Sequence, residues 1–312
     1  MNRRQFVTLT AFLSLCLPAT FRTRPAGAQP AAGKVLKFAQ IADVHMTGFT
    51  VAPDGALCVR ILPHAPANIN RRYDLMGYLL PLALKQIREQ FPPDFLVFTG
   101  DQVDIGSGPQ GEVDERQFKA LAAKNAAGME LHYVLGNHDG PQSRWSGIFG
   151  PLNYTFDEGD VRIVVLNSGG TNAGAEQESS LVALNELKQA IATAQSRRLL
   201  VFVHQWINPA GIPGMSMARS AEIRQVIQAY PRSVAVINGH IHAGAYSQVD
   251  GVHYFTARAF CEPPLCFYTY ELSADTLAVV EHSWNSLGRA FVTKTTRELP
   301  VRASAKAMPA AH

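Results

Sequence analysis

Five short stretches of the sequence carry side chains that bind metal ions or transfer protons. The densest is LGNHDG, residues 135–140, in which Asn137, His138 and Asp139 are consecutive. The other four supply carboxylates and imidazoles: Asp43 and His45, Asp101 and Asp104, His204, and His240 with His242. Carboxylate, amide oxygen and imidazole together suit intermediate metals such as Zn, Mn, Fe or Co rather than calcium. Two such ions about 3.5–4 Å apart can bind both oxygens of an in-line displacement, and a shared aspartate would hold that spacing.

Each of the five stretches follows a segment with the pattern of a strand. Strands are expected at 35–43, 94–101, 130–135, 197–204 and 233–240, and helices at 74–90, 112–126, 177–195 and 217–229. Residues 154–168 and 243–284 are typical of hairpins. This alternation predicts one α/β domain. Because ligands bind at the carboxyl ends of strands in open α/β sheets, the five stretches would meet at that edge.

The ordered set D-x-H, G-D-x-x-D, G-N-H-D, a lone His and G-H-x-H spans residues 43–242. It resembles the calcineurin-like metallophosphoesterase superfamily, and within it the class III phosphodiesterase-like branch. The resemblance implies a four-layer α/β/β/α sandwich of two mixed sheets flanked by helices. It also implies two divalent or trivalent metal ions, with Mn, Fe or Zn expected. Asp43, His45 and His242 would hold the first ion, Asn137, His204 and His240 the second, and Asp101 would bridge them.

The same resemblance implies roles for residues that are not ligands. His138 would face the scissile phosphate, as general acid for the leaving oxygen or as a charge clamp. Asp104 would orient His138 and keep it protonated. A hydroxide bridging the two ions would be the attacking group, and Asp139 could cap its loop or take part in the chemistry.

Two departures from the family pattern stand out. His204 is followed by Gln205-Trp206, where the family commonly has x-Pro. Asp104 stands where purple acid phosphatases carry a metal-binding tyrosine. We therefore expect no colour from charge transfer between tyrosine and iron.

The two ends of the chain differ from its centre. Arg3-Arg4 precede an apolar run, and Ala26-Gly27-Ala28 provides a cleavage pattern, so residues 1–28 are expected to be a twin-arginine signal peptide. A Sec-type or membrane-anchoring segment is the alternative. The catalytic domain would occupy 35–298, and 299–312 would be a disordered tail. A periplasmic or secreted location follows.

Composition narrows the range of partners. The formal charge of +3 falls to about −1 without the four arginines of the signal peptide, so no nucleic-acid surface is evident. After signal removal no apolar run approaches the roughly 18 residues needed to span a bilayer. The sequence leaves the oligomeric state open.

Several residues have two readings. Arg71 and Arg72 could contact substrate phosphate or lie on a solvated surface. Core packing is favoured over a pocket wall for Trp206, Met215 and Met217. Cys58, Cys261 and Cys266 are favoured as structural cysteines over a zinc site, and a Cys261–Cys266 disulfide is possible in an oxidising compartment. The segment 46–73 contains an expected hairpin and could be a lid, a binding loop or a dimer contact. The histidines outside the five stretches are interpreted as structural or surface residues: His64, His132, His253 and His282.

These features together predict an exported metal-dependent phosphoesterase acting on a small-molecule phosphate ester, with phosphodiesters favoured. A phosphomonoesterase on the same dinuclear site is the alternative of the same class. A metal-dependent binding or scaffold protein without catalysis is the alternative of another class.

Overall fold

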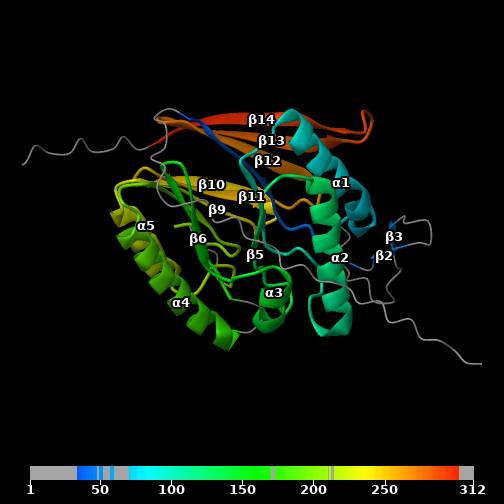
Figure 1. The fold of residues 1–312 in the computed structure, drawn as a ribbon, viewed down its shortest axis with the longest axis horizontal. Coiled ribbons are helices and arrows are strands. Elements are labelled where there is room, and N and C mark those ends of the chain that lie inside the picture. The colour runs from blue at the N-terminus through cyan, green and yellow to red at the C-terminus, as the bar shows by residue number, and fades with distance from the viewer. Residues whose placement is uncertain are drawn as a thin grey trace, which may run out of the picture.

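Two six-stranded sheets stack face to face at the centre of the protein (Figure 1). The computed structural model describes residues 34–47, 49–51, 57–59, 70–169, 173–209, 211 and 214–301. The predicted signal peptide and residues 302–312 of the predicted tail lie outside these ranges. The first sheet has the order β14 (Ala290–Pro300), β13 (Thr276–Asn285), β12 (Cys266–Leu272), β1 (Leu36–Ile41), β4 (Phe95–Thr99) and β5 (Leu131–Val134). The second has the order β10 (Ala243–Val249), β11 (Val252–Arg258), β9 (Ser233–Asn238), β8 (Arg198–Phe202), β7 (Val161–Val165) and β6 (Tyr154–Glu158).

Helices cover the outer face of each sheet. A core cluster joins α1 (Tyr73–Gln90), α2 (Gly108–Ala126) and α3 (Gln142–Ile148) to the first sheet. Another joins α4 (Ala173–Ala192) and α5 (Ser220–Ala229) to the second sheet. A third cluster fills the space between the sheets, where the Phe38 ring stacks on those of Phe95 and Tyr270. The four-layer α/β/β/α sandwich of mixed sheets is therefore confirmed.

The strands that precede the five polar stretches are parallel and deeply buried. β1 pairs in parallel with β4, and β4 with β5. In the other sheet β8 pairs in parallel with β7 and with β9. Every residue of β4, β8 and β9 is buried, as is usual for parallel strands covered on both faces. The carboxyl ends of these strands lie along a common edge of the sandwich, and the polar stretches begin at that edge.

Some local features differ from the expected elements. The α2 helix begins at Gly108 rather than near 112, with Pro109 in its first turn, where a missing N–H removes no helical hydrogen bond. The short helix α3 has no counterpart among the expected elements. Strand β14 runs past the expected boundary at 298, because Leu299 is buried and pairs with Leu277. The hairpin expected within 46–73 forms between β2 (Phe49–Val51) and β3 (Leu57–Val59).

Cys261 and Cys266 are both free thiols. Cys261 belongs to the cluster under α1 and α2, whereas Cys266 belongs to the cluster between the sheets. The two side chains thus lie on opposite faces of the first sheet, and the disulfide does not form. Burial raises the pKa of Cys266 to about 12 and that of Cys261 far above its usual value.

Candidate metal centre

Four of the predicted ligands surround one point at the end of β1. The ligand atoms of Asp43, His45, Asp101 and His242 all lie within 4.8 Å of one another. The Nε2 atoms of His45 and His242 are 3.3 Å apart. The carboxylates close the group, with His242 Nε2 at 3.6 Å from Asp43 Oδ1 and His45 Nε2 at 3.4 Å from Asp101 Oδ2. We call this group site one.

A second group lies on the other side of Asp101. The ligand atoms of Asp101, His204 and His240 again lie within 4.8 Å of one another. His204 Nε2 is 3.3 Å from Asp101 Oδ1 and 3.0 Å from the amide oxygen of Asn137. We call this group, with Asn137, site two. The two oxygens of Asp101 therefore face different sites, as a bridging carboxylate would.

The histidine rings are held so that their Nε2 atoms point inward. His45 Nδ1 donates a hydrogen bond to Asp104 Oδ1 at 3.0 Å. His204 Nδ1 donates to the Thr99 carbonyl at 2.8 Å, and His242 Nδ1 donates to Glu262 Oε1 at 2.7 Å. A proton fixed on Nδ1 leaves the Nε2 lone pair available to a cation. His240 Nε2 is buried and has no hydrogen-bond partner among the described residues. An orphaned nitrogen, converging lone pairs and two carboxylates are the donor set that fits a pair of metal ions.

Unusual backbone conformations aim these side chains. Asp43, His45, Asp101 and His240 all have positive φ, between 48° and 71°, a region that residues other than glycine rarely adopt. Such conformations cost roughly 1–3 kcal/mol each and concentrate at functional sites. The chain thus turns sharply as each strand ends, and the side chain is directed at the centre rather than along the strand.

Two glycines allow the loops to approach closely. A Cβ at Gly136 would lie 2.1 Å from the Asp101 backbone nitrogen, and a Cβ at Gly100 would lie 2.0 Å from His204 Nδ1. No real Cβ tolerates such contacts, so both positions require glycine. Asp139 adds to this packing, since its carboxylate accepts hydrogen bonds from the Gly136 and Val103 backbone nitrogens. It ties two of the loops together.

The electrostatics of the site favour cations. Burial raises the pKa of Asp43 to about 6. Burial also opposes ionisation of Asp101, but attraction to the His204 ring holds the pKa of Asp101 well below its usual range. Burial opposes the charge on His204 too, yet Asp101 raises the pKa of His204 to about 10. Burial lowers the pKa of His45 to about 4 and that of His240 to about 3. The lowered pKa values of His45 and His240 keep both rings neutral near pH 7, so that their lone pairs can bind a cation.

His138 lies beside the cluster and is more exposed than the ligands. Its side chain is 35% exposed, whereas those of His45 and His204 are fully buried. Its Nδ1 donates to the backbone carbonyl of Asp104 at 2.7 Å. The Asp104 carboxylate is 3.9 Å from that nitrogen and instead contacts His45 and the Arg71 guanidinium. Orientation of His138 thus comes from the main chain of residue 104, while the carboxylate supports site one.

The sequence did not single out Glu262, and the solvated-surface interpretation of Arg71 is wrong because its side chain is 14% exposed. Glu262 accepts the His242 Nδ1 hydrogen bond, and Arg71 Nε lies 3.7 Å from the same Glu262 oxygen. One mostly buried guanidinium therefore joins the two carboxylates that hold the imidazoles of site one. Neither residue belongs to a motif, and Glu262 lies in the loop 259–265 after β11, so nothing in the sequence pattern marks it.

Core packing is confirmed for Trp206 and Met217 but not for Met215. Arg72 forms an exposed ion pair with Asp74 at 2.7 Å. Trp206 and Met217 are buried, and Met217 belongs to the core under α4 and α5, while Met215 is exposed. Cys261 is closer to the chemistry than expected, because its sulfur lies within 4.8 Å of ring nitrogens of His45 and His242.

A four-layer sandwich with this site at the strand ends defines a metallophosphoesterase. The family model for calcineurin-like phosphoesterase matches residues 36–244. The chain belongs to the calcineurin-like phosphoesterase family, whose members are metal-dependent hydrolases of phosphoric esters. Among the described residues no helix is both long and apolar enough to cross a bilayer.

Relatives and solved structures resemble the chain along most of its length. A 3',5'-cyclic-nucleotide phosphodiesterase from Nostoc sp. is 25% identical over 211 residues, which cover 63% of this chain and 71% of the relative. A dimetal phosphatase from Danio rerio superposes with a TM-score of 0.63 at 16% identity, covering 85% of this chain and 98% of that one. GAP50, described as the anchor in the inner membrane complex of Plasmodium, superposes with a TM-score of 0.59 at 14% identity, covering 87% of this chain and 90% of that one. These two structures share the fold.

Proposed function

We propose that the protein is an exported hydrolase of phosphodiesters with a dinuclear metal centre. The observation that carries the proposal is the position of Asp101, whose two oxygens lie 3.4 Å from His45 Nε2 and 3.3 Å from His204 Nε2. A pair of bound ions would supply Lewis-acid polarisation of the phosphoryl group and a bridging hydroxide as nucleophile.

The protein's own residues would hold the metal ions and supply a proton to the leaving oxygen. The seven predicted ligands of sites one and two would hold the ions. His138 donates its Nδ1 proton to the Asp104 carbonyl, so Nε2 is the atom left to meet the substrate. A proton on Nε2 would pass to the leaving oxygen, a role that commonly contributes about 10²–10⁴-fold to a rate. The partial exposure of the His138 ring is consistent with access by a substrate.

Preference for diesters is supported by the Nostoc relative, which is named a cyclic-nucleotide phosphodiesterase. The Danio rerio structure is named a phosphatase and motivates the monoester alternative on the same centre. Hydrolysis of p-nitrophenyl phosphate and bis-p-nitrophenyl phosphate by the full chain, with added manganese, separates the two. Diester turnover supports the proposal, and turnover of the monoester alone refutes the diester preference.

A scaffold without catalysis is the candidate of another class, because GAP50 shares the fold and is described as an anchor. The full ligand set weighs against this reading here. Metal-loaded protein that hydrolyses neither p-nitrophenyl ester would establish it. Asp101→Asn is the direct test of the bridging role: loss of both metals and of turnover is expected, and unchanged turnover refutes the scheme.

Export by the twin-arginine route rests on Arg3 and Arg4. The route carries folded proteins, so metals could load before translocation. Replacing both arginines by lysine keeps the charge but removes the signal, and should retain the protein in the cytoplasm. Unchanged export in cell fractionation would favour a Sec-type signal.

A further inference from the structure

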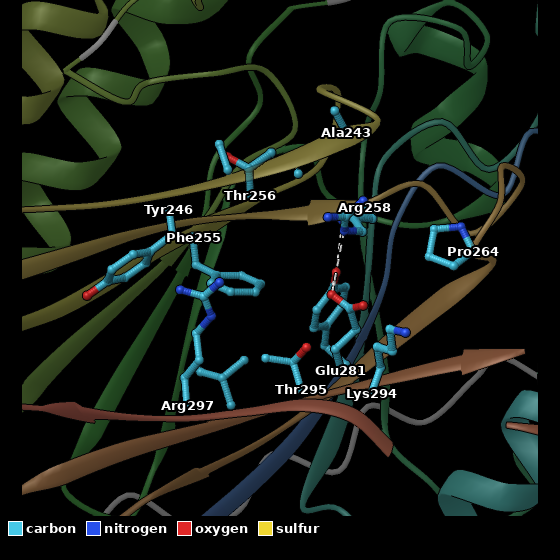
Figure 2. A pocket seen from close by; sticks show the side chains of 14 residues that line it. Ala243, Tyr246, Phe255, Thr256, Arg258, Pro264, Glu281, Lys294, Thr295 and Arg297 are labelled. Carbon is cyan, nitrogen blue, oxygen red and sulfur yellow. Dashed lines mark hydrogen bonds and ion pairs between the residues drawn. The ribbon is translucent and has the colours of Figure 1, made fainter. Parts of the chain in front are cut away.

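A cavity opens between the two sheets (Figure 2). One wall comes from β10 and β11, and the other from β12, β13 and β14, which are edge and near-edge strands of the two sheets. The cavity has a volume of about 320 Å³, within the range of small-molecule sites. None of the predicted metal ligands lines it, although Ala243 on its rim directly follows His242.

The cavity carries an excess of positive charge. Arg258 from β11 faces Lys294 and Arg297 from β14 across the opening, as Figure 2 shows. Glu281 is the acidic residue of the lining, and it is engaged by the Tyr268 hydroxyl at 2.9 Å and by Arg258 Nε at 3.6 Å. In the part of the chain that the structure describes, neither Lys294 nor Arg297 has a carboxylate within ion-pair distance. Lys294 and Arg297 are exposed, and neither charge has a carboxylate partner among the described residues.

Aromatic side chains line the cavity next to these charges. Phe255 and Tyr268 are buried and meet edge to face, with ring centroids 5.2 Å apart. The Arg297 guanidinium carbon lies 5.5 Å from the centroid of the Tyr246 ring, and Figure 2 shows this side chain reaching up between Tyr246 and Phe255. Aromatic rings and a guanidinium plane together accept a stacked aromatic group.

We propose that this cavity binds a phosphomonoester dianion attached to an aromatic ring, of the nucleoside monophosphate class. A phosphomonoester carries about −1.5 to −2 charge near pH 7, which matches the two unpaired cations, whereas a diester carries a single charge. Arginine presents its donors in a fork that fits phosphate oxygens. The site should therefore prefer a monoester to the corresponding diester. If the proposed diester hydrolysis holds, the ligand is a product of the protein's own reaction, and this assignment of its source rests on the proposed function.

The test is binding to the full chain by calorimetry, with adenosine monophosphate, cyclic adenosine monophosphate, adenosine and inorganic phosphate as probes. Asp101→Asn serves as background, because it removes turnover and phosphate binding at the metal centre while leaving the cavity intact. In that background we expect adenosine monophosphate to bind at a single site, more tightly than the other three probes. Because Arg258 is 45% exposed at the rim, affinity should fall as salt rises.

Arg297→Ala and Lys294→Ala each remove a charged partner and should weaken binding about tenfold. Lys188→Ala, which removes an exposed lysine from α4, is the matched control and should bind as the background does. Unfolding temperatures of all three variants, measured alongside, exclude loss of fold as the cause. Equal affinity of the three variants, or equal binding of monoester and diester, would overturn the proposal.

The outcomes also separate this site from the proposed function. Arg297→Ala in the otherwise unaltered chain should hydrolyse bis-p-nitrophenyl phosphate at the normal rate. Binding without any hydrolysis by the unaltered chain would refute the proposed function and leave the cavity site standing. If the unaltered chain hydrolyses the diester but the Asp101→Asn variant does not bind adenosine monophosphate, the cavity site is refuted and the proposed function stands.

Discussion

Replacing Glu262 by glutamine should weaken one metal site and spare the other. Glu262 Oε1 accepts the proton on His242 Nδ1 at 2.7 Å, and this bond orients the ring whose Nε2 belongs to site one. Glutamine keeps the shape and an acceptor oxygen but removes the charge. Among the described residues, neither His204 nor His240 of site two contacts Glu262, so the perturbation stays at site one.

The size of the effect follows from the environment of the bond. The His242 and Glu262 side chains are 17% and 19% exposed, so water screens their interaction only partly. A hydrogen bond to a charged group contributes about 1.5–3 kcal/mol, and a neutral amide should keep roughly half of that. The lost half, about 0.75–1.5 kcal/mol, corresponds to a loss of up to about tenfold in affinity, at the lower end of the 10–100-fold typical when a ligand's outer hydrogen bond is removed.

The assay is metal titration of chelator-treated protein, with bound metal counted by mass spectrometry. Filling site one of Glu262→Gln should require about tenfold more metal than in the unaltered chain, whereas site two should fill at the same metal concentration in both. Glu271→Gln is the control, because Glu271 forms an exposed ion pair with Lys37 at 2.9 Å on β12 and touches no ligand. Two ions bound with unchanged affinity would refute the reasoning, as would equal weakening of both sites.

Three further changes test other parts of the site and fold. Gly136→Ala should abolish metal binding, because the new Cβ would lie 2.1 Å from the Asp101 nitrogen. The control Gly147→Ala in α3 places a Cβ that meets nothing within 4 Å and should leave metal binding unchanged. The metal content of the two variants is the measurement, and a normal content in Gly136→Ala would contradict the predicted clash. His138→Ala should keep both metals and lose about 10²–10⁴-fold in turnover, and full turnover would exclude its role as acid. His282 has its pKa lowered by burial from 6.5 to about 4, so the unfolded chain binds its proton first and stability falls as pH drops from 6.5 to 4. With allowance for partial exposure, His282→Gln should make the decrease in the free energy of unfolding between pH 6.5 and 4 smaller by about 1–2 kcal/mol, as measured by urea unfolding. An unchanged dependence of that free energy on pH would contradict the lowered pKa of His282.

The ordered polar stretches were readable because each is local. Asp43 with His45 and His240 with His242 are separated by one residue, and each pair follows an apolar segment long enough to be a buried strand. The carboxyl ends of such strands share an edge in an α/β fold. From this the layers and the gathering of the ligands could be predicted.

Other features depended on contacts between distant segments. Glu262 meets His242 because the loop after β11 folds back over site one, and Arg71 reaches both Glu262 and Asp104 from the start of α1. The partner of the Asp104 carboxylate could not be predicted either, since the backbone of that residue, not its side chain, meets His138. Nothing local encodes these pairs.

The amino-acid sequence by itself determined which chemical groups are present and which strand ends carry them, because hydrophobic alternation and short motifs are properties of neighbouring residues. Only the tertiary structure decided how those groups are held. The positive φ angles at Asp43, His45, Asp101 and His240 exist because packing of the surrounding loops outweighs the local backbone preference. The same holds for the cavity between β11 and β14, whose charges come together only when the edges of two separate sheets are stacked.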